Sequence, residues 1–151
     1  MESVSEGKIA DSVGCTANVV LIIGNKIYCA NAGDSRSVLS RKGKAITLST
    51  DHKPEAEEER KRINDAGGIV DKGRINGHLN LSRSIGDLHY KRQSFLPPDK
   101  QIVISKPDLV EVELIKNDDF IISGCDGVWE RYEFDSQGFV EHIQGQRFKG
   151  V

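Results

Sequence analysis

Residues 119–130 read DFIISGCDGVWE, an apolar run followed by a turn that carries a carboxylate. The apolar run at 120–122 is too short for a helix and rich in β-branched residues, which predicts a buried strand. The small residues from Gly124 to Gly127 allow the backbone to bend sharply. An ionised Asp126 at the end of a buried strand is costly unless a cation or donor compensates it. We therefore predict that Asp126 binds Mg²⁺ or Mn²⁺, which take oxygen ligands; the alternative is an ordinary Asp-Gly turn.

A second acidic residue of similar setting lies at Asp34, in the segment GDSR at 33–36. One interpretation is an Asx turn, in which the side chain bonds a nearby backbone amide. Arg36 is also close enough in sequence to pair with this carboxylate. The functional hypothesis is that Asp34 lies at a strand end beside Asp126 and shares a metal with it.

The first third of the chain has the pattern of antiparallel strands. Apolar runs at 15–24 and 27–33 flank a short Gly-Asn-Lys turn, which predicts a β-hairpin. Further runs at 37–40 and 45–49 extend it to a meander of three or four strands. Because the runs are nearly continuous, we expect these strands to be covered on both faces.

The next segment, from Pro54 to Gly68, predicts a charged helix. Pro54 suits the first turn, acidic residues precede basic ones as the helix dipole prefers, and Gly67-Gly68 supplies a C-cap. We expect its charged run to be a solvated face. Asp51-His52, just before it, is expected to cap the start of the helix.

The rest of the chain alternates short strands and loops. Strands are predicted near 69–70, 74–75 and 102–104, with a longer alternating strand at 109–115. For Arg83 we expect an internal salt bridge or a loop anchor, with anion binding as the alternative. The segment after Glu130 reads as a loop, and Ser136 is expected to start a short helix.

Composition limits the classes of partner and of location. The chain of 151 residues has 21 basic and 23 acidic residues, a net charge of −2, which gives no electrostatic case for binding nucleic acid or an anionic membrane. No apolar run approaches the length of a membrane span, and the N-terminus does not resemble a secretory signal. Cys15, Cys29 and Cys125 are expected to be free, buried thiols. These features fit a reducing cytoplasmic or nuclear location.

Several segments in order resemble the PP2C-type metal-dependent protein serine/threonine phosphatases. They read GCTA from Gly14, IYCANAGDSRSVL from Ile27, LSTDHKP from Leu48, ERKRINDAGGIV, RINGHLNLSRSIGD, KPDLVEVEL and DDFIISGCDGVWE. The resemblance implies an α+β fold, a truncated, mainly antiparallel β-sandwich flanked by helices in α-β-β-α layers. It also implies a binuclear Mg²⁺ or Mn²⁺ centre.

The resemblance implies roles for three residues. Asp126 takes the position of a metal ligand, and Asp34 that of a ligand at a further metal position. Glu130 stands where the family usually has an Asp that can contribute to this further site, so its side chain is one methylene longer. No catalytic side chain is assigned, because a metal-activated water serves as the nucleophile in such enzymes.

The implied function is hydrolysis of phosphomonoesters on phosphoserine and phosphothreonine proteins. We expect residues 1–13 to be a tail or helix remnant and residues 14–151 to be a partial phosphatase domain. The family's early Arg and acidic segments, its Asp-Gly-His segment and its late Asp-Asn segment have no counterpart here. The chain alone is therefore expected to bind Mn²⁺ weakly and to hydrolyse phosphate poorly or not at all. Open sheet edges favour a homodimer. The alternative function is a catalytically dead phosphatase-like binding or scaffold module.

Overall fold

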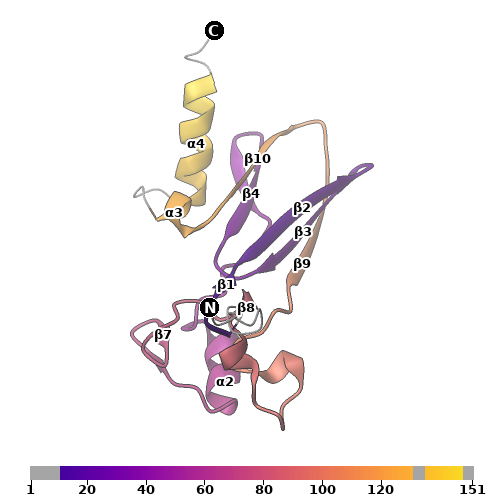
Figure 1. Cartoon of the computed structure of the whole chain (residues 1–151). Helices are drawn as coiled ribbons and strands as arrows, with labels where there is room; N and C mark the ends of the chain where they lie inside the picture. Colours follow the sequence, from indigo (N-terminus) through magenta and orange to yellow (C-terminus); the bar gives the residue numbers. More distant parts are fainter. Residues whose placement is uncertain (1–10, 131–134, 148–151) are drawn as a thin grey trace, which may run out of the picture. The chain divides into compact units, whose positions relative to one another are not determined.

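The computed structural model describes residues 11–130 and 135–147, which form two compact units (Figure 1). Within the described residues, the first unit comprises 11–17, 32–34 and 51–107. The second comprises 18–31, 35–50, 108–130 and 135–147. Most of the predicted tail at 1–13, and most of the loop predicted at 131–135, lie outside the described residues.

The second unit is an antiparallel β-sandwich. One sheet has the order β2-β3-β9, from strands Ala17–Ile23, Lys26–Ala32 and Asp108–Glu113. The other has the order β10-β4-β5, from strands Asp118–Gly124, Arg36–Arg41 and Lys44–Thr47. The predicted mainly antiparallel sandwich is confirmed. The single meander expected for the first third is wrong, because β2–β3 and β4–β5 are two hairpins in different sheets.

Side chains from both sheets fill the space between them. Ile27 and Cys29 of β3 pack with Leu39 of β4 and with Leu48, and all four are almost fully buried. Val110 and Val112 of β9 add to this cluster, as their alternation with exposed glutamates predicted. Burial of such side chains stabilises the fold by about 1.5–3 kcal/mol each.

The predicted strand at 120–122 forms as part of β10, but it is half-buried rather than buried. In the sheet as described, β10 stands at the end of the order and pairs with β4. Both faces of the strand carry apolar side chains. Ile121 packs in the core between the sheets, while Phe120 and Ile122 pack against residues of the helices. An outer strand with two apolar faces explains the unbroken run in the sequence.

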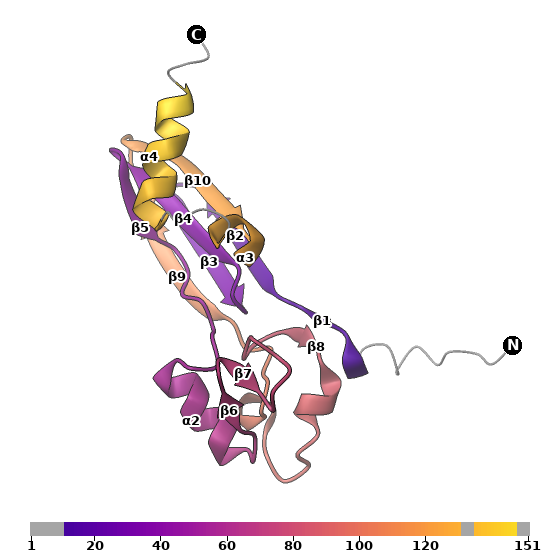
Figure 2. The same ribbon diagram turned by 90° about the vertical axis from the view of Figure 1, so that its left-hand side faces the viewer.

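Two helices cover the outer face of the β10-β4-β5 sheet. They are α3, Asp126–Trp129, and α4, Ser136–Arg147, which lies along the sheet in Figure 2. Trp129, Phe139 and Val140 pack on Val38 of β4. The helix predicted after Ser136 is confirmed, but the carboxylate of Asp135 accepts the capping bond from the Gly138 amide at 2.8 Å. Within the described residues, no helix combines the length and apolar character that crossing a bilayer requires.

The outer face of the β2-β3-β9 sheet is exposed in the described part of the chain. Val19 and Leu21 of β2 and Leu109 of β9 are 58%, 53% and 78% exposed. The expectation that the first strands are covered on both faces is therefore wrong for β2. Of the predicted α-β-β-α layers, the described residues of this unit show one helix layer and the two sheets.

The cysteines differ from expectation in burial. All three are free thiols, but only Cys29 is buried, whereas Cys15 and Cys125 are exposed. Cys29 points between the sheets, while Cys125 lies in the turn after β10 and Cys15 in the short strand β1. Their small or apolar neighbours in the sequence therefore did not indicate burial.

The first unit is built around α2, Glu57–Asp65. It also contains the pair β1, Gly14–Cys15, with β8, Ile85–Gly86, and the small hairpin β6, Val70–Asp71, with β7, Arg74–Ile75. Two 3₁₀ helices follow, η1 at Leu88–Lys91 and η2 at Pro98–Lys100. The strand predicted at 102–104 is wrong: Ile104 makes one isolated bridge to Arg83, and Ile102 and Val103 are core residues.

Helix α2 ends as predicted and starts differently. Gly67 has φ +87°, and the Gly68 amide donates to the Ile63 carbonyl at 2.9 Å, the closing bond of a glycine C-cap. The N-cap is Ala56, which makes no side-chain capping bond. The expected capping role of Asp51-His52 is therefore wrong, and His52 has a different partner, described below.

The charged run of α2 is not a uniformly solvated face, because Glu59 is buried at 3% exposure. Its carboxylate accepts hydrogen bonds from Arg62 at 2.7 Å and from Arg83 at 2.7 Å. Ser82 Oγ donates a third bond. Burial alone would raise the pKa of Glu59, but the bonds from Arg83 and Ser82 and the charge of Arg62 outweigh it and hold the pKa at about 2.

We expect Glu59→Gln to destabilise the protein by about 3 kcal/mol at pH 7, because it leaves two buried guanidinium groups without their shared anion. The folded-state pKa of Glu59 lies below the unfolded value. Its contribution is therefore complete above about pH 4.3 and is lost as the pH falls toward about 2. Urea unfolding at pH 7 and pH 3 measures both effects. Glu58→Gln, at an exposed neighbouring position, is the control; equal losses for the two variants would contradict the prediction.

Candidate metal centre

The Asp126 carboxylate is carried by a tight turn at the end of β10. The strand ends at Gly124, Cys125 is extended with φ −79° and ψ 178°, and α3 begins at Asp126. A Cβ on Gly124 would lie 2.9 Å from the Cβ of Val128, closer than side chains normally approach. Glycine at this position therefore lets the first turn of α3 fold back against the strand end.

The side chain of Asp126 is half-buried and makes a local bond. Its Oδ1 accepts a hydrogen bond from the Gly127 amide at 2.8 Å, at the start of α3. Glu130 follows at the C-terminal cap of α3, is exposed, and donates its amide to the Asp126 carbonyl at 2.7 Å. Residues four apart lie on one helix face. The structure thus brings two of the three predicted carboxylates onto the same turn.

Trp129 anchors this turn to the sandwich. The indole Nε1–H donates to the Gly124 carbonyl at 2.8 Å, and the ring lies edge-on to Phe139 with centroids 5.1 Å apart. The guanidinium of Arg36 lies over the ring, 5.4 Å from its centroid. Of the two large apolar residues of α3, Trp129 is buried and Val128 is exposed.

Asp34 belongs to the first unit, in the connection between β3 and β4. The preceding Gly33 has φ +116°, and a Cβ there would lie 2.4 Å from Cγ2 of Thr16. His52 bonds to the backbone on both sides of Gly33. Its ring Nδ1 is 3.1 Å from the Gly33 amide nitrogen, and its own amide donates to the Gly33 carbonyl at 3.0 Å. His52 thus positions the backbone next to Asp34.

The Asp34 carboxylate is 4% exposed and accepts a hydrogen bond from Lys53 Nζ at 2.6 Å. The ion pair with Arg36 that the sequence suggested is not the one seen, since Arg36 Nη1 donates to Ser136 Oγ at 3.3 Å. Lys53 was missed because it lies 19 residues from Asp34. No local sequence signal could have linked the two.

The ladder between β4 and β10 relates the two acidic segments by register. Arg36, the first residue of β4, pairs with Gly124, the last residue of β10. Asp34 precedes Arg36 by two residues along the chain, and Asp126 follows Gly124 by two. Each acidic residue therefore lies two residues in sequence from this pair.

The donor chemistry of the three carboxylates fits a hard divalent cation. Mg²⁺ and Mn²⁺ take oxygen ligands, and Mg²⁺ is commonly held by one or two carboxylates together with water molecules. Among residues 11–130 and 135–147, no three carboxylate, imidazole or thiol groups lie together as a metal site. Asp126 and Glu130 are the two predicted ligands that lie close together in the chain, four residues apart.

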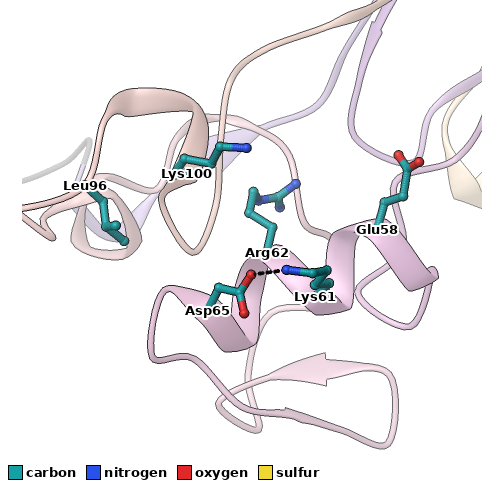
Figure 3. Close-up of a pocket in the computed structure, with 6 residues that line it drawn as sticks. All are labelled: Glu58, Lys61, Arg62, Asp65, Leu96 and Lys100. Atoms are coloured by element: carbon teal, nitrogen blue, oxygen red, sulfur yellow. Dashed lines mark hydrogen bonds and ion pairs between the residues drawn. The ribbon is translucent and has the colours of Figure 1, made fainter.

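A separate hollow of about 280 Å³ lies beside α2 in the first unit (Figure 3). Its lining consists of Glu58, Lys61, Arg62, Asp65, Leu96 and Lys100. None of the three predicted metal ligands is among them. Lys61 pairs with Asp65 at 2.6 Å, and Arg62 is held by Glu59. Arg83 forms the predicted internal salt bridge, also with Glu59.

The chain resembles known proteins along nearly its whole length. The family model described as protein phosphatase 2C matches residues 2–148. The rice protein "Probable protein phosphatase 2C 11" is 53% identical over 150 residues, covering 94% of this chain and 41% of its own length. The Paramecium tetraurelia protein "Probable protein phosphatase 2C 6" is 52% identical over 137 residues, covering 91% of this chain and 46% of its own length. The chain thus spans less than half of each relative.

Solved structures agree with this assignment. A crystal structure of a phosphatase from a pathogenic strain of Toxoplasma gondii matches with a TM-score of 0.73 and 36% identity, over 83% of this chain and 39% of that one. The fold, the order of the sequence segments and the family model all point the same way. The chain belongs to the protein phosphatase 2C family.

Proposed function

We propose that this protein acts as a metal-dependent phosphatase on phosphoserine and phosphothreonine proteins. The observation that carries the proposal is the position of Asp126 in a chain that belongs to the protein phosphatase 2C family. Asp126 begins α3, which packs so closely on the end of β10 that only glycine fits at position 124. Residues 14–151 would be a partial catalytic domain, in line with relatives more than twice the length of the matched region.

The metal ligands we propose are Asp126, Glu130 and Asp34. A pair of bound Mg²⁺ or Mn²⁺ ions supplies an activated water and neutralises charge on the phosphoryl oxygens. Asp126 is the first residue of α3 and Glu130 is its C-cap, four residues later, a spacing at which side chains of a helical turn can approach each other. The longer side chain of Glu130 reaches further from the backbone than the family's usual Asp. Membership of the protein phosphatase 2C family supports a role for Asp34 as well.

Retention of both Asp34 and Asp126 favours catalysis over the scaffold alternative. Asp34 is buried and paired with Lys53, and the two partners of such an ion pair can often be replaced together by apolar residues without loss of stability. A module without catalytic demand gains little from keeping such a charge. The free state of all three cysteines supports the proposed cytoplasmic or nuclear location.

A homodimer through the open sheet edge is the partner proposal that goes with this function. Strand β2 stands at one end of the β2-β3-β9 order, and its exposed residues include Val19, Leu21, Ile22 and Ile23. Apolar edge strands favour pairing with another chain. Two copies related by a twofold axis would bury the same edge in each.

For the metal site, we expect Asp126→Ala to weaken Mn²⁺ binding by at least about tenfold, because it removes a direct ligand. Electron paramagnetic resonance of free Mn²⁺ measures the affinity of the 151-residue chain. Hydrolysis of a phosphothreonine peptide is expected to be slow, dependent on Mn²⁺ and lost in the variant. Glu111→Ala, which removes a surface carboxylate paired with Lys26, is the matched control. Rapid turnover that survives Asp126→Ala would overturn the proposal.

For the dimer, we expect the weight-average mass to rise with protein concentration in sedimentation equilibrium. Leu21→Lys should suppress the rise, because it places a charge on the apolar edge strand. Phe95→Lys, which changes an apolar residue that is 79% exposed in the first unit, should not. A monomer at all concentrations, or equal effects of the two variants, counts against the dimer.

A further inference from the structure

We propose that Trp129 and Arg36 are positioning residues that hold the Asp126 carboxylate in the direction needed to bind a divalent cation. This inference rests on the proposed function, in which Asp126 is a metal ligand. It adds a cause for the orientation of that ligand, and it concerns side chains that supply no oxygen, nitrogen lone pair or thiolate to a divalent metal ion.

The bond from the Trp129 indole to the Gly124 carbonyl closes the turn around Asp126. Its donor and acceptor belong to residues five apart, and Asp126 lies between them in the chain. The amides of Val128 and Trp129 also point back to the Cys125 carbonyl, at 3.0 and 3.4 Å. With both ends of the segment tied, the backbone at Asp126 has little freedom to rotate. Such constraint is what a metal ligand requires, because the geometry around these cations is demanding.

Arg36 joins three parts of the structure at this point. In the ladder it pairs with Gly124, the residue whose carbonyl accepts the indole N–H. Its guanidinium lies 5.4 Å from the centre of the Trp129 ring, within the range of a cation–π interaction. The same guanidinium donates to Ser136 Oγ at the start of α4, at 3.3 Å. Arg36 therefore holds the ring against the strand end from which the turn departs.

Burial keeps the tryptophan in a single orientation. The residue is 6% exposed and packs with Val38, Phe139 and Val140. The Phe139 ring meets it at an interplanar angle of 68°. A buried indole normally finds a partner for its N–H, and here that partner is a backbone atom of the turn itself. Packing thus fixes the orientation of the Trp129 ring, and the hydrogen bond from its indole holds the backbone at Gly124.

The hydrogen bond can be separated from the packing by mutation. Trp129→Phe keeps an aromatic ring in the cluster but removes the donor to Gly124. Val140→Ala, in the same cluster, creates a cavity without touching that bond. If Trp129 only stabilises the fold, the two variants should have similar Mn²⁺ affinity. If Trp129 positions Asp126, only Trp129→Phe should weaken Mn²⁺ binding.

The first measurement is Mn²⁺ affinity of the 151-residue chain by electron paramagnetic resonance, with urea unfolding in parallel. We expect about a tenfold loss for Trp129→Phe and less than a twofold change for Val140→Ala, even where Val140→Ala lowers the unfolding midpoint more. Arg36→Met should fall between them, because it leaves the indole bond in place but removes its support. Equal affinity of Trp129→Phe and wild type would overturn the inference.

The second measurement needs no metal. The Gly127 amide donates to Asp126 Oδ1, so its hydrogen exchange reports how firmly the carboxylate is held. We expect exchange at Gly127 to be faster in Trp129→Phe than in wild type or Val140→Ala. Equal exchange in the three proteins would overturn the inference.

A third measurement separates this inference from the proposed function. Trp129 is the single tryptophan of the chain, so paramagnetic Mn²⁺ bound at Asp126 should quench its fluorescence, and Mg²⁺ should reverse the quenching by competition. Loss of quenching in Asp126→Ala supports the site itself. If Asp126→Ala binds Mn²⁺ like wild type, the proposed site and the positioning role both fail. If Asp126→Ala loses Mn²⁺ binding but Trp129→Phe, which has no tryptophan and is followed by electron paramagnetic resonance, binds Mn²⁺ like wild type, only the positioning role fails.

Discussion

The pairing of β4 with β10 is the constraint on which the second unit depends. Its ladder runs from Arg41 opposite Asp118 to Arg36 opposite Gly124, with one irregularity near Asp118. One face of the pair contributes Leu39 and Ile121 to the core between the sheets, and the other receives α3 and α4. Because side chains alternate along a strand, a shift of one residue would exchange these faces. The position of the turn after β10 is thus set by the same register that forms the core.

Hydrogen bonds between polar side chains of neighbouring strands reinforce this register. Ser37 Oγ of β4 lies 2.6 Å from Ser123 Oγ of β10, and the Asn18 side chain of β2 bonds Asn31 and Ser49. Buried polar groups are costly unless they are paired, so the network is satisfied only when these strands meet in one arrangement. In the described residues, no buried side-chain polar atom lacks a partner. In the first unit, the buried charge of Glu59 is likewise paired, with Arg62 and Arg83.

Much of the fold was predictable from residues that are close in sequence. The hairpin β2–β3, the alternation of β9, the glycine end of α2 and the strand before Asp126 all follow from periodicity and from glycine. The errors arose where burial depends on distant partners. Nothing near Glu59 indicates that Arg83 reaches it, and nothing in the run at 102–104 distinguishes a strand from a buried irregular segment. Likewise, sequence alone could not show that consecutive hairpins enter different sheets.

The candidate site divides in the same way. The sequence by itself determined the family, the acidic residues at 34, 126 and 130, and the small residues that let a turn form around Asp126, because these depend on residue type and short spacing. Only the tertiary structure decided that Lys53 pairs with Asp34, and that Arg36 and Trp129 brace the turn at Asp126. The Lys53–Asp34 and Arg36–Trp129 contacts join residues 19 and 93 positions apart along the chain, which meet only once the chain has folded.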